Sequence, residues 1–598
     1  MTKTLVIVES PAKASKIQEY LGDDYIVMAS VGHITELAKG GKHGLGVDVD
    51  NNFKPHYVLM DDKIEVLNNL MNAAKKCNNI IIGSDNDREG EAIAWHLAQR
   101  LGEMDKPIKR MVFNKIKKDA LVKAVKEVRD IDINLFHSQE ARRILDRLVG
   151  FTASPFLMNF FGPKLSAGRV QSVVTRMVID REREIEVFVP EEFWTIQVNL
   201  SKDGKIGFVT KYSGRPTDQA TAEAIRAKLA AKEAEFVVAE VIADEEKKSP
   251  LPPLVTSTLQ QVMSKEHSFS ADRTMKAAQA LYEAGYVTYI RTDSVRVDDA
   301  SVKELRGWLQ ANQYDVPNKP NTFKNRDAAQ DAHECIHPTD LELLPERNFA
   351  IIDPDEKLVY EVIWNYFVAS QMMPAVYNTL KVTAHVQGDP AAEVKASGKA
   401  LKSQGFLQIL GVNDDSKIDI PELHKGDILK HFGKMPVKME RKQTQPPPRY
   451  SEDKLIKELV NKNIGRPSTY GELLSKVSNR SYVEKKGNVY HATELGKKIT
   501  DVLINNFSFM DYNFTANLEK LLDDIADGKS DHIVVLKEFW KIFSIELFKV
   551  YAAFDTNKIV CDKCWNVMIK RVGKFGNFYS CVNPSCKRII NENLQGQT

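Results

Sequence analysis

Two features that define other classes of protein are missing from this sequence. No uninterrupted apolar run is long enough to cross a bilayer, and residues 4–8 are too short an apolar run for a signal peptide. No phosphate-binding loop with two glycines four apart, followed by Lys and Ser or Thr, is present. We therefore expect a cytoplasmic protein that makes no contact with a membrane and does not bind ATP through such a loop.

An excess of charge of one sign is also missing. The 83 Lys and Arg residues nearly balance the 81 Asp and Glu residues, which gives a net charge of +2. Binding to nucleic acid would therefore depend on local basic clusters and not on a global field. A length of 598 residues, with 43% hydrophobic and 27% charged residues, indicates an ordinary globular protein of about three to five domains.

Cysteine is scarce, and four of the six cysteines lie in the C-terminal tail. Cys77 and Cys335 are isolated, which is typical of reduced thiols. The tail has one pair of cysteines with two residues between them and a second pair with four residues between them. In a reducing compartment such pairs predict one structural Zn²⁺ site and not disulfides. The expected ligands are Cys561, Cys564, Cys581 and Cys586.

The N-terminal region alternates strands and helices. Residues 4–8 and 80–83 are short β-branched runs typical of strands buried in a parallel sheet, and we expect helices over 14–21 and 92–101. In such α/β units the functional site lies at the carboxyl ends of the strands. The residues at these ends therefore become candidates for chemistry.

An acidic loop follows the second of these strands. Asp85, Asp87 and Glu89 are spaced two apart, so their carboxylates can converge and bind Mg²⁺. An EF-hand loop is excluded because position twelve is His96. The alternative is that the acidic residues only favour a helix N-terminus. Glu9 would emerge beside this loop, and there it could transfer protons or form a simple surface ion pair.

A short segment, residues 286–294, carries the candidate nucleophile. We expect a helix over 270–285 and then a strand, which would direct Tyr289 and Arg291 from the same face. A phenol beside a guanidinium suits attack on a phosphodiester, because the cation holds the phosphate and stabilises phenolate. The alternative is that these side chains only pack on a surface.

Basic and helix-turn-helix patterns occur on both sides of this segment. Arg142, Arg143 and Arg147 share one face of an expected helix. Residues 450–465 resemble 269–285, and they precede a helix and a hairpin at 486–488, the order of a winged helix. Each unit could bind nucleic acid or serve as scaffolding. The β-rich regions that flank the tyrosine segment indicate one domain interrupted by another.

Together these motifs resemble the type IA DNA topoisomerases over nearly the whole chain, and Ile290 with residues 91–96 favours the topoisomerase I branch of bacteria. A topoisomerase III-like decatenase and a non-catalytic zinc and helix-turn-helix DNA-binding protein are the alternatives. The segments that carry the resemblance are 8–13, 30–34, 84–96, 110–114, 141–150, 165–172, 288–294, 332–339 and 464–470.

The resemblance implies an ATP-independent enzyme that relaxes negatively supercoiled DNA by transient single-strand cleavage, strand passage and religation. Tyr289 would be the nucleophile and form a 5′-phosphotyrosine, while Arg291 holds the scissile phosphate and His333 assists. Glu9 would exchange a proton with the 3′-oxygen, and Lys13 would stabilise the phosphate. The bond energy stored in the covalent intermediate lets the strand be resealed without ATP.

The resemblance also implies cofactors and partners. Mg²⁺ would be bound by Glu9, Asp85, Asp87 and Glu89. The protein would act as a monomer on single-stranded segments of DNA at the bacterial nucleoid, and its tail would contact RNA polymerase. The residues expected to bind DNA are His33, Arg88, Arg110, Arg142, Arg143, Asp146, Arg147, Arg169, Gln171, Ser172, Arg466 and Thr469.

The implied fold is a multidomain α+β torus with a C-terminal zinc ribbon. Its parts would be a Toprim α/β domain at 1–131, a DNA-groove and winged-helix base at 132–187 and 438–555, a β-rich arch at 188–250 and 375–437, the tyrosine domain at 251–374, and the tail at 556–598. Two features depart from the family. His337 stands where arginine is expected to contact phosphate, and the tail has a single four-cysteine module, which predicts weaker processivity.

Overall fold

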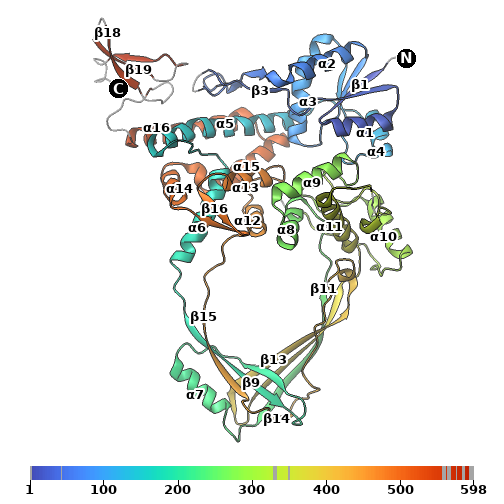
Figure 1. The fold of residues 1–598 in the computed structure, drawn as a ribbon, viewed down its shortest axis with the longest axis vertical. Helices are drawn as coiled ribbons and strands as arrows, with labels where there is room; N and C mark the ends of the chain where they lie inside the picture. Colours follow the sequence, from blue (N-terminus) through green and yellow to red (C-terminus); the bar gives the residue numbers. More distant parts are fainter. Residues whose placement is uncertain are drawn as a thin grey trace.

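The computed structural model describes residues 3–41, 44–326, 333–347, 350–554, 561, 568–573, 576–581 and 586–591. The chain forms a ring of helical and α/β regions closed on one side by a long β-sheet (Figure 1). This arrangement agrees with the expected multidomain α+β torus. Within the described residues, no helix combines the length and apolarity that crossing a membrane requires.

A four-stranded parallel sheet forms the N-terminal region. Its order is β2-β1-β7-β8, and both faces are buried. Leu5 and Ile7 pack towards α2 and α3, whereas Val6 and Val8 pack towards α1 and α4, so β1 is apolar at successive positions. The elements are β1 (Thr4–Val8), β2 (Tyr25–Ala29), β7 (Asn79–Ile82), β8 (Ile108–Arg110), α1 (Pro11–Leu21), α2 (Ile64–Lys75), α3 (Arg88–Leu101) and α4 (Lys118–Lys126).

The two strands predicted from sequence are confirmed and are neighbours. β1 pairs with β7 in parallel, with Ile7 opposite Ile82, so the residues after both strands lie at one edge. A small extension joins this region through β3 (Thr35–Leu37), β4 (Val47–Asp48), β5 (Lys54–Pro55) and β6 (Tyr57–Leu59). The short 3₁₀ helices found among the described residues are η2 (Asp61–Lys63), η3 (Gly102–Met104), η4 (Pro345–Arg347), η5 (Gly405–Gln408) and η6 (Ser508–Met510).

Seven helices and a hairpin form the base of the ring around the largest apolar core. The central helix α5 packs against α3, α15 and α16. The winged-helix order predicted from sequence is confirmed, because two helices are followed by an antiparallel hairpin. The elements are α5 (Ile133–Phe161), α6 (Gln171–Glu186), α12 (Glu452–Asn461), α13 (Tyr470–Ser478), β16 (Val483–Lys486), β17 (Val489–Ala492), α14 (Glu494–Asn506), α15 (Tyr512–Ala526) and α16 (His532–Phe554).

The arch is one seven-stranded sheet built from two distant stretches of the chain. Its order is β10-β13-β12-β11-β14-β9-β15, and β11 pairs with β12 along its whole length. The chain therefore leaves this sheet for the tyrosine region and returns to it. The elements are β9 (Glu192–Ser201), β10 (Phe208–Tyr212), α7 (Gln219–Leu229), β11 (Phe236–Lys248), β12 (Ala375–Val386), β13 (Asp389–Ser403), β14 (Ile428–His431) and β15 (Val437–Gln443).

Four helices form the tyrosine region between the two stretches of the arch. Ser270 caps α9 through its side chain, as expected. The strand expected after this helix is wrong, because the segment makes only a single bridge, between Val287 and Pro338. The elements are α8 (Thr256–His267), α9 (Ala271–Glu283), α10 (Asp299–Ala311) and α11 (Pro354–Ser370), and the tail adds β18 (Met568–Gly573), β19 (Gly576–Cys581) and β20 (Ile589–Asn591).

A hydrogen bond joins the N-terminal region to the base. The Tyr57 hydroxyl on β6 donates to Glu140 on α5 at 3.0 Å. Burial raises the pKa of Glu140 from 4.5 to about 7. Between these two values the folded protein keeps a proton that the unfolded chain releases, so its free energy of unfolding falls as the pH rises.

We expect Glu140→Gln to remove this pH dependence, because glutamine can accept the same hydrogen bond without ionising. Relative to the wild type, the variant should gain stability from pH 5 to pH 8, by at most about 3 kcal/mol. Thermal melting at both pH values measures the gain. The exposed carboxylate Glu65 on α2 gives a matched control, Glu65→Gln, and an equal response of both variants would contradict the expectation.

Candidate active site

The acidic loop lies at the edge where β1 and β7 end. Asp87 caps α3, since its Oδ1 atom accepts a hydrogen bond from the Gly90 amide at 2.8 Å. The helix begins at Arg88, four residues before the expected start, because this cap extends it. The acidic residues therefore do stabilise a helix N-terminus, which was the alternative interpretation, but the other carboxylate oxygen of Asp87 is directed elsewhere.

Two internal contacts fix the backbone of this loop. A Cβ atom at Gly90 would lie 2.1 Å from the Asp85 carbonyl oxygen, so only glycine fits there. The guanidinium of Arg110 donates to the same Asp85 carbonyl at 2.6 Å and to Glu91 at 3.2 Å. Arg110 is fully buried. Its contacts hold the loop from inside the protein, and a direct contact of Arg110 with DNA stays a prediction.

Glu9 and Lys13 meet the loop from the end of β1 and the start of α1. The Lys13 ammonium contacts Asp85 at 2.6 Å, and both side chains are buried. The Asp85 amide donates to the Glu9 carboxylate at 2.8 Å. Burial, reinforced by the charge of Asp85, raises the pKa of Glu9 to about 8. Glu9 is therefore protonated at neutral pH in this state and can act as an acid.

Tyr289 reaches the acidic loop from the tyrosine region, which packs directly against the N-terminal region (Figure 1). Its hydroxyl donates to Asp87 Oδ2 at 2.5 Å, and only 2% of its surface is exposed. Burial and the nearby Asp87 charge raise the pKa of Tyr289 well above its usual value. Burial opposes ionisation of Asp87, but Arg291 and the tyrosine hydrogen bond outweigh it and lower the pKa of this carboxyl. The proton therefore stays on the phenol, and Asp87 is the acceptor.

Arg291 and His333 complete the surroundings of the phenol. The Arg291 guanidinium lies 2.9 Å from Glu89 and 3.6 Å from Asp87. The His333 ring lies 5.7 Å from the Tyr289 ring, and its buried Nδ1 atom has no hydrogen-bond partner among the described residues. Burial lowers the pKa of His333, so its ring is neutral and available to a ligand.

A cavity of about 250 Å³ opens beside these groups and gathers residues from four separated parts of the chain. Nine of the predicted site residues line it, which is the strongest sign that the predicted chemistry belongs to one place. They are Asp87, Arg88, Glu89, Arg142, Asp146, Arg291, His333, Arg466 and Thr469.

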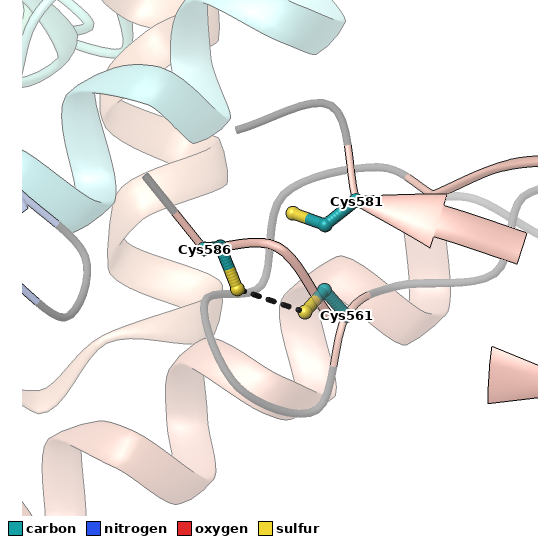
Figure 2. A group of neighbouring side chains, drawn as sticks. All are labelled: Cys561, Cys581 and Cys586. Atoms are coloured by element: carbon teal, nitrogen blue, oxygen red, sulfur yellow. Dashed lines mark hydrogen bonds between the residues drawn. The ribbon is translucent and has the colours of Figure 1, made fainter. Parts of the chain in front are cut away.

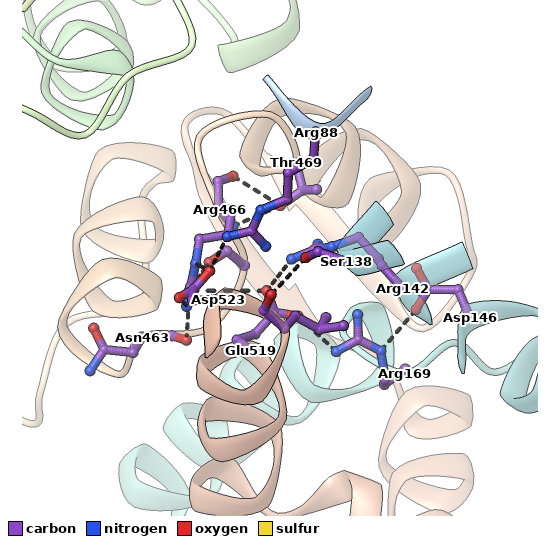
Figure 3. A network of polar contacts seen from close by, with 12 residues as sticks. Arg88, Ser138, Arg142, Asp146, Arg169, Asn463, Arg466, Thr469, Glu519 and Asp523 are labelled. Atoms are coloured by element: carbon purple, nitrogen blue, oxygen red, sulfur yellow. Dashed lines mark hydrogen bonds and ion pairs between the residues drawn. The ribbon is translucent and has the colours of Figure 1, made fainter. Parts of the chain in front are cut away.

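Arginines around Glu519 form one wall of the site (Figure 3). Glu519 on α15 is completely buried, and it binds Arg142 and lies 2.7 Å from Arg169. Asp523, one turn further on, pairs with Arg466 at 2.5 Å. Burial disfavours the charged form of Glu519, but the arginines outweigh this effect and lower its pKa. The three arginines predicted to bind DNA are therefore held in place by carboxylates that the sequence analysis missed.

The remaining predicted DNA contacts differ in exposure. His33 lies 3.8 Å from Glu89, and burial lowers its pKa to about 4. Arg143 is half-buried, and Arg147 donates to the Leu37 carbonyl at 3.2 Å. Gln171 and Ser172 are buried, and the Ser172 hydroxyl accepts from the Gly168 amide. Their role as DNA contacts stays a prediction.

Three tail cysteines lie together in Figure 2. Their sulfur atoms all lie within 4.8 Å of one another, and the Sγ atoms of Cys561 and Cys586 are 3.7 Å apart. Two thiolates on a tetrahedral Zn²⁺ lie about 3.8 Å apart, given Zn–S bonds of about 2.3 Å. Cys581 supplies a third thiol, and Cys564 lies outside the described residues. The arrangement fits zinc.

Comparison with known proteins agrees with this site. The DNA topoisomerase family model matches residues 130–537, and the Toprim domain model matches residues 4–116. Curated proteins named DNA topoisomerase 1 from Pseudomonas aeruginosa and Salmonella typhimurium are 37% and 36% identical over 99% of this chain, which covers 74% and 73% of their lengths. A solved full-length topoisomerase I from Thermotoga maritima is 33% identical, with a TM-score of 0.80, over 98% of this chain and 97% of that one.

A Toprim domain joined in a ring to a buried tyrosine defines an ATP-independent enzyme that cleaves and reseals one DNA strand at a time. The chain belongs to the type IA DNA topoisomerases, in the bacterial topoisomerase I branch. The decatenase and the non-catalytic DNA-binding protein are not favoured.

Replacement of Gly90 tests the fixed geometry of the acidic loop. Gly90→Ala would force its Cβ atom against the Asp85 carbonyl, shift the carboxylates and lower DNA relaxation on the order of 100-fold. Gly102→Ala is the matched control at the other end of α3, where a Cβ atom meets nothing within 4 Å. Plasmid relaxation and thermal melting measure both variants, and an equal effect of the two substitutions would contradict the expectation.

Proposed function

We propose that Tyr289 is the nucleophile that cleaves one strand of DNA. The observation that carries the proposal is the hydrogen bond from its hydroxyl to Asp87 at 2.5 Å, which joins the tyrosine region to the acidic loop beside Arg291. A buried phenol beside a carboxylate acceptor and a guanidinium has what attack on a phosphodiester requires, namely a proton acceptor and a cation for the phosphate.

In the proposed cleavage step, the Tyr289 oxygen forms a bond to phosphorus while the bond from phosphorus to the 3′-oxygen breaks. The phenol proton passes to Asp87, and the 3′-oxygen takes a proton from Glu9, whose raised pKa keeps it protonated at neutral pH. Lys13 and Arg291 stabilise the charge on the phosphate. Religation is the reverse reaction, in which the 3′-hydroxyl attacks and the phenol leaves.

We propose Mg²⁺ at the acidic loop, with Asp85, Asp87, Glu89 and Glu9 as its candidate ligands. Carboxylate oxygens are the ligands that this ion prefers, and bound Mg²⁺ would position and neutralise the phosphate. In the structure, Lys13 neutralises Asp85 and Arg291 neutralises Glu89. Binding of the ion would require these cations to turn away from the carboxylates and towards the DNA phosphate. We propose that the ion serves mainly the religation step.

The remaining assignments are proposals that the arrangement in Figure 1 supports. The division into Toprim region, base, arch, tyrosine region and tail follows the boundaries expected from sequence. The contact between Tyr289 and Asp87 would open as the gate for the passing strand. Zn²⁺ would hold the tail, which would bind the passing single strand and RNA polymerase. We also propose that the protein acts as a monomer at the nucleoid, where its DNA substrate lies.

The decisive variant is Tyr289→Phe. Removal of the hydroxyl abolishes the covalent bond to DNA, so relaxation of negatively supercoiled plasmid should be lost completely, while binding of single-stranded DNA is kept. Tyr286→Phe, in the same segment, is the matched control and should relax the plasmid normally. Relaxation by the Tyr289 variant would contradict the mechanism.

Removal of Mg²⁺ separates the two half-reactions. With a chelator present, cleavage of a single-stranded oligonucleotide should persist, because Glu9, Lys13 and Arg291 belong to the protein. Religation should fall at least about tenfold, because the phosphate then lacks its divalent cation. Covalent complex trapped by denaturant measures both steps. Equal loss of cleavage and religation would place the metal in cleavage instead.

A further inference from the structure

A second cluster of ionisable side chains lies behind the active-site segment, outside the residues used in the mechanism. His337 is buried, and Glu334 and Asp298 lie beside it, with one ligand atom of each residue within 4.8 Å of the others. His337 is also the position at which the resemblance to the family leads us to expect an arginine. The structure shows it directed at carboxylates, and it is absent from the residues lining the cavity beside Tyr289.

The hydrogen bond of the His337 ring determines which nitrogen faces the carboxylates. Nδ1 lies 2.9 Å from the Pro338 carbonyl oxygen, which can only accept, so Nδ1 carries the proton. In the neutral ring Nε2 then presents a lone pair towards Glu334. Histidines that bind metals show this same pattern, in which one ring N–H donates to a backbone carbonyl and the other nitrogen binds the ion.

The separation of Nε2 from Glu334 Oε2 is 3.4 Å. A charge-assisted hydrogen bond between these groups would be about 2.7–2.9 Å long. Two ligands on a tetrahedral Zn²⁺ lie about 3.4 Å apart, given bonds of about 2.0–2.1 Å to nitrogen and oxygen. The observed spacing therefore matches two ligands of one ion better than it matches a direct ion pair.

The two carboxylates, Asp298 and Glu334, also interact directly with each other. Asp298 caps α10 and accepts hydrogen bonds from the amide and hydroxyl of Ser301, and Glu334 is its hydrogen-bonding neighbour. Two carboxylates in contact repel each other unless a proton or a cation lies between them. Lys115 supplies part of this charge, since it acts on Asp298 from the side of a small cavity that His337 lines.

We propose that Asp298, Glu334 and His337 bind a divalent transition-metal ion of the zinc class, at a site separate from the acidic loop and from the tail. One nitrogen and two carboxylate oxygens, with a water molecule as the fourth ligand, suit Zn²⁺. Arginine at position 337 would supply the positive charge from the protein itself, so the histidine creates the need for a metal ion.

The site would act on the segment that carries Tyr289. The Thr288 amide donates to the His337 carbonyl at 2.9 Å, and the His337 amide donates to the Thr288 hydroxyl at 2.9 Å. Thr288 directly precedes Tyr289. An ion that joins His337 to the start of α10 would therefore hold in place the backbone on which the nucleophile is mounted, without touching the DNA.

Zinc binding to the full-length protein tests the proposal. With Mg²⁺ in excess to occupy the acidic loop, equilibrium dialysis against micromolar Zn²⁺ should give one more equivalent for the wild type than for His337→Arg. Glu334→Gln should lose the same equivalent. Glu304→Gln, an exposed carboxylate on α10 outside the cluster, is the matched control and should keep it.

Two further measurements exclude misfolding and fix the location. His337→Arg should melt without zinc at a temperature no lower than the metal-free wild type, since its guanidinium pairs with both carboxylates. Added zinc should raise the melting temperature of the wild type and of Glu304→Gln more than that of His337→Arg. Anomalous diffraction at the zinc edge should show a peak between Nε2 and Glu334. Equal zinc stoichiometry for wild type and His337→Arg, or binding only at millimolar zinc, overturns the proposal.

Discussion

The structure depends on how one acidic loop is neutralised. Asp85, Asp87 and Glu89 follow a buried strand, and Asp85 is itself buried whereas Glu89 is exposed. Repulsion between three neighbouring carboxylates requires counter-charges. Lys13 neutralises one of them from α1, and Tyr289 and Arg291 satisfy the other two from the neighbouring tyrosine region. The contact that closes the ring is therefore also the contact that assembles the active site, so closure and catalytic geometry cannot be separated.

Neutralisation of a buried carboxylate by cations from distant parts of the chain occurs a second time, in the base. Glu519 is buried among arginines that come from α5, from the turn before α6 and from the turn before α13. A lone buried carboxylate would be unstable, and buried arginines would be equally so. Together they fix guanidinium groups at the wall of the cavity beside Tyr289 (Figure 3). Under the proposed function, a DNA phosphate entering this cavity would meet donors already oriented by Glu519 and Asp523.

The sequence predicted those features of the fold that are determined by neighbouring residues. The strands at 4–8 and 80–83, the cap at Ser270 and the winged helix all follow from runs of a few residues. The strand expected at 286–290 did not form, because its apolar residues pack against the segment 335–339 and not in a sheet. Nothing in the sequence indicated that Glu519 is buried, because an acidic residue on an amphipathic helix normally faces water. The burial of Arg110 could not be predicted either, because it depends on partners that lie 19 and 25 residues away in the sequence.

Under the proposed mechanism, opening of the ring would break two kinds of contact. The polar contacts of the acidic loop can be exchanged for phosphate and Mg²⁺ at little net cost, since charged partners replace charged partners. The apolar contacts behind them cannot be exchanged in this way, because phosphate and Mg²⁺ do not replace buried side chains. This apolar cluster joins the two regions: it contains Val8, Ile116 and Leu121 of the Toprim region together with Leu281 and Val287 of the tyrosine region. Separation of these surfaces costs about 25 cal/mol for each Å² of apolar area exposed. These contacts therefore stabilise the closed ring. Under the proposed mechanism, a DNA strand bound covalently to Tyr289 would keep the cleaved end attached to the protein while the ring opens.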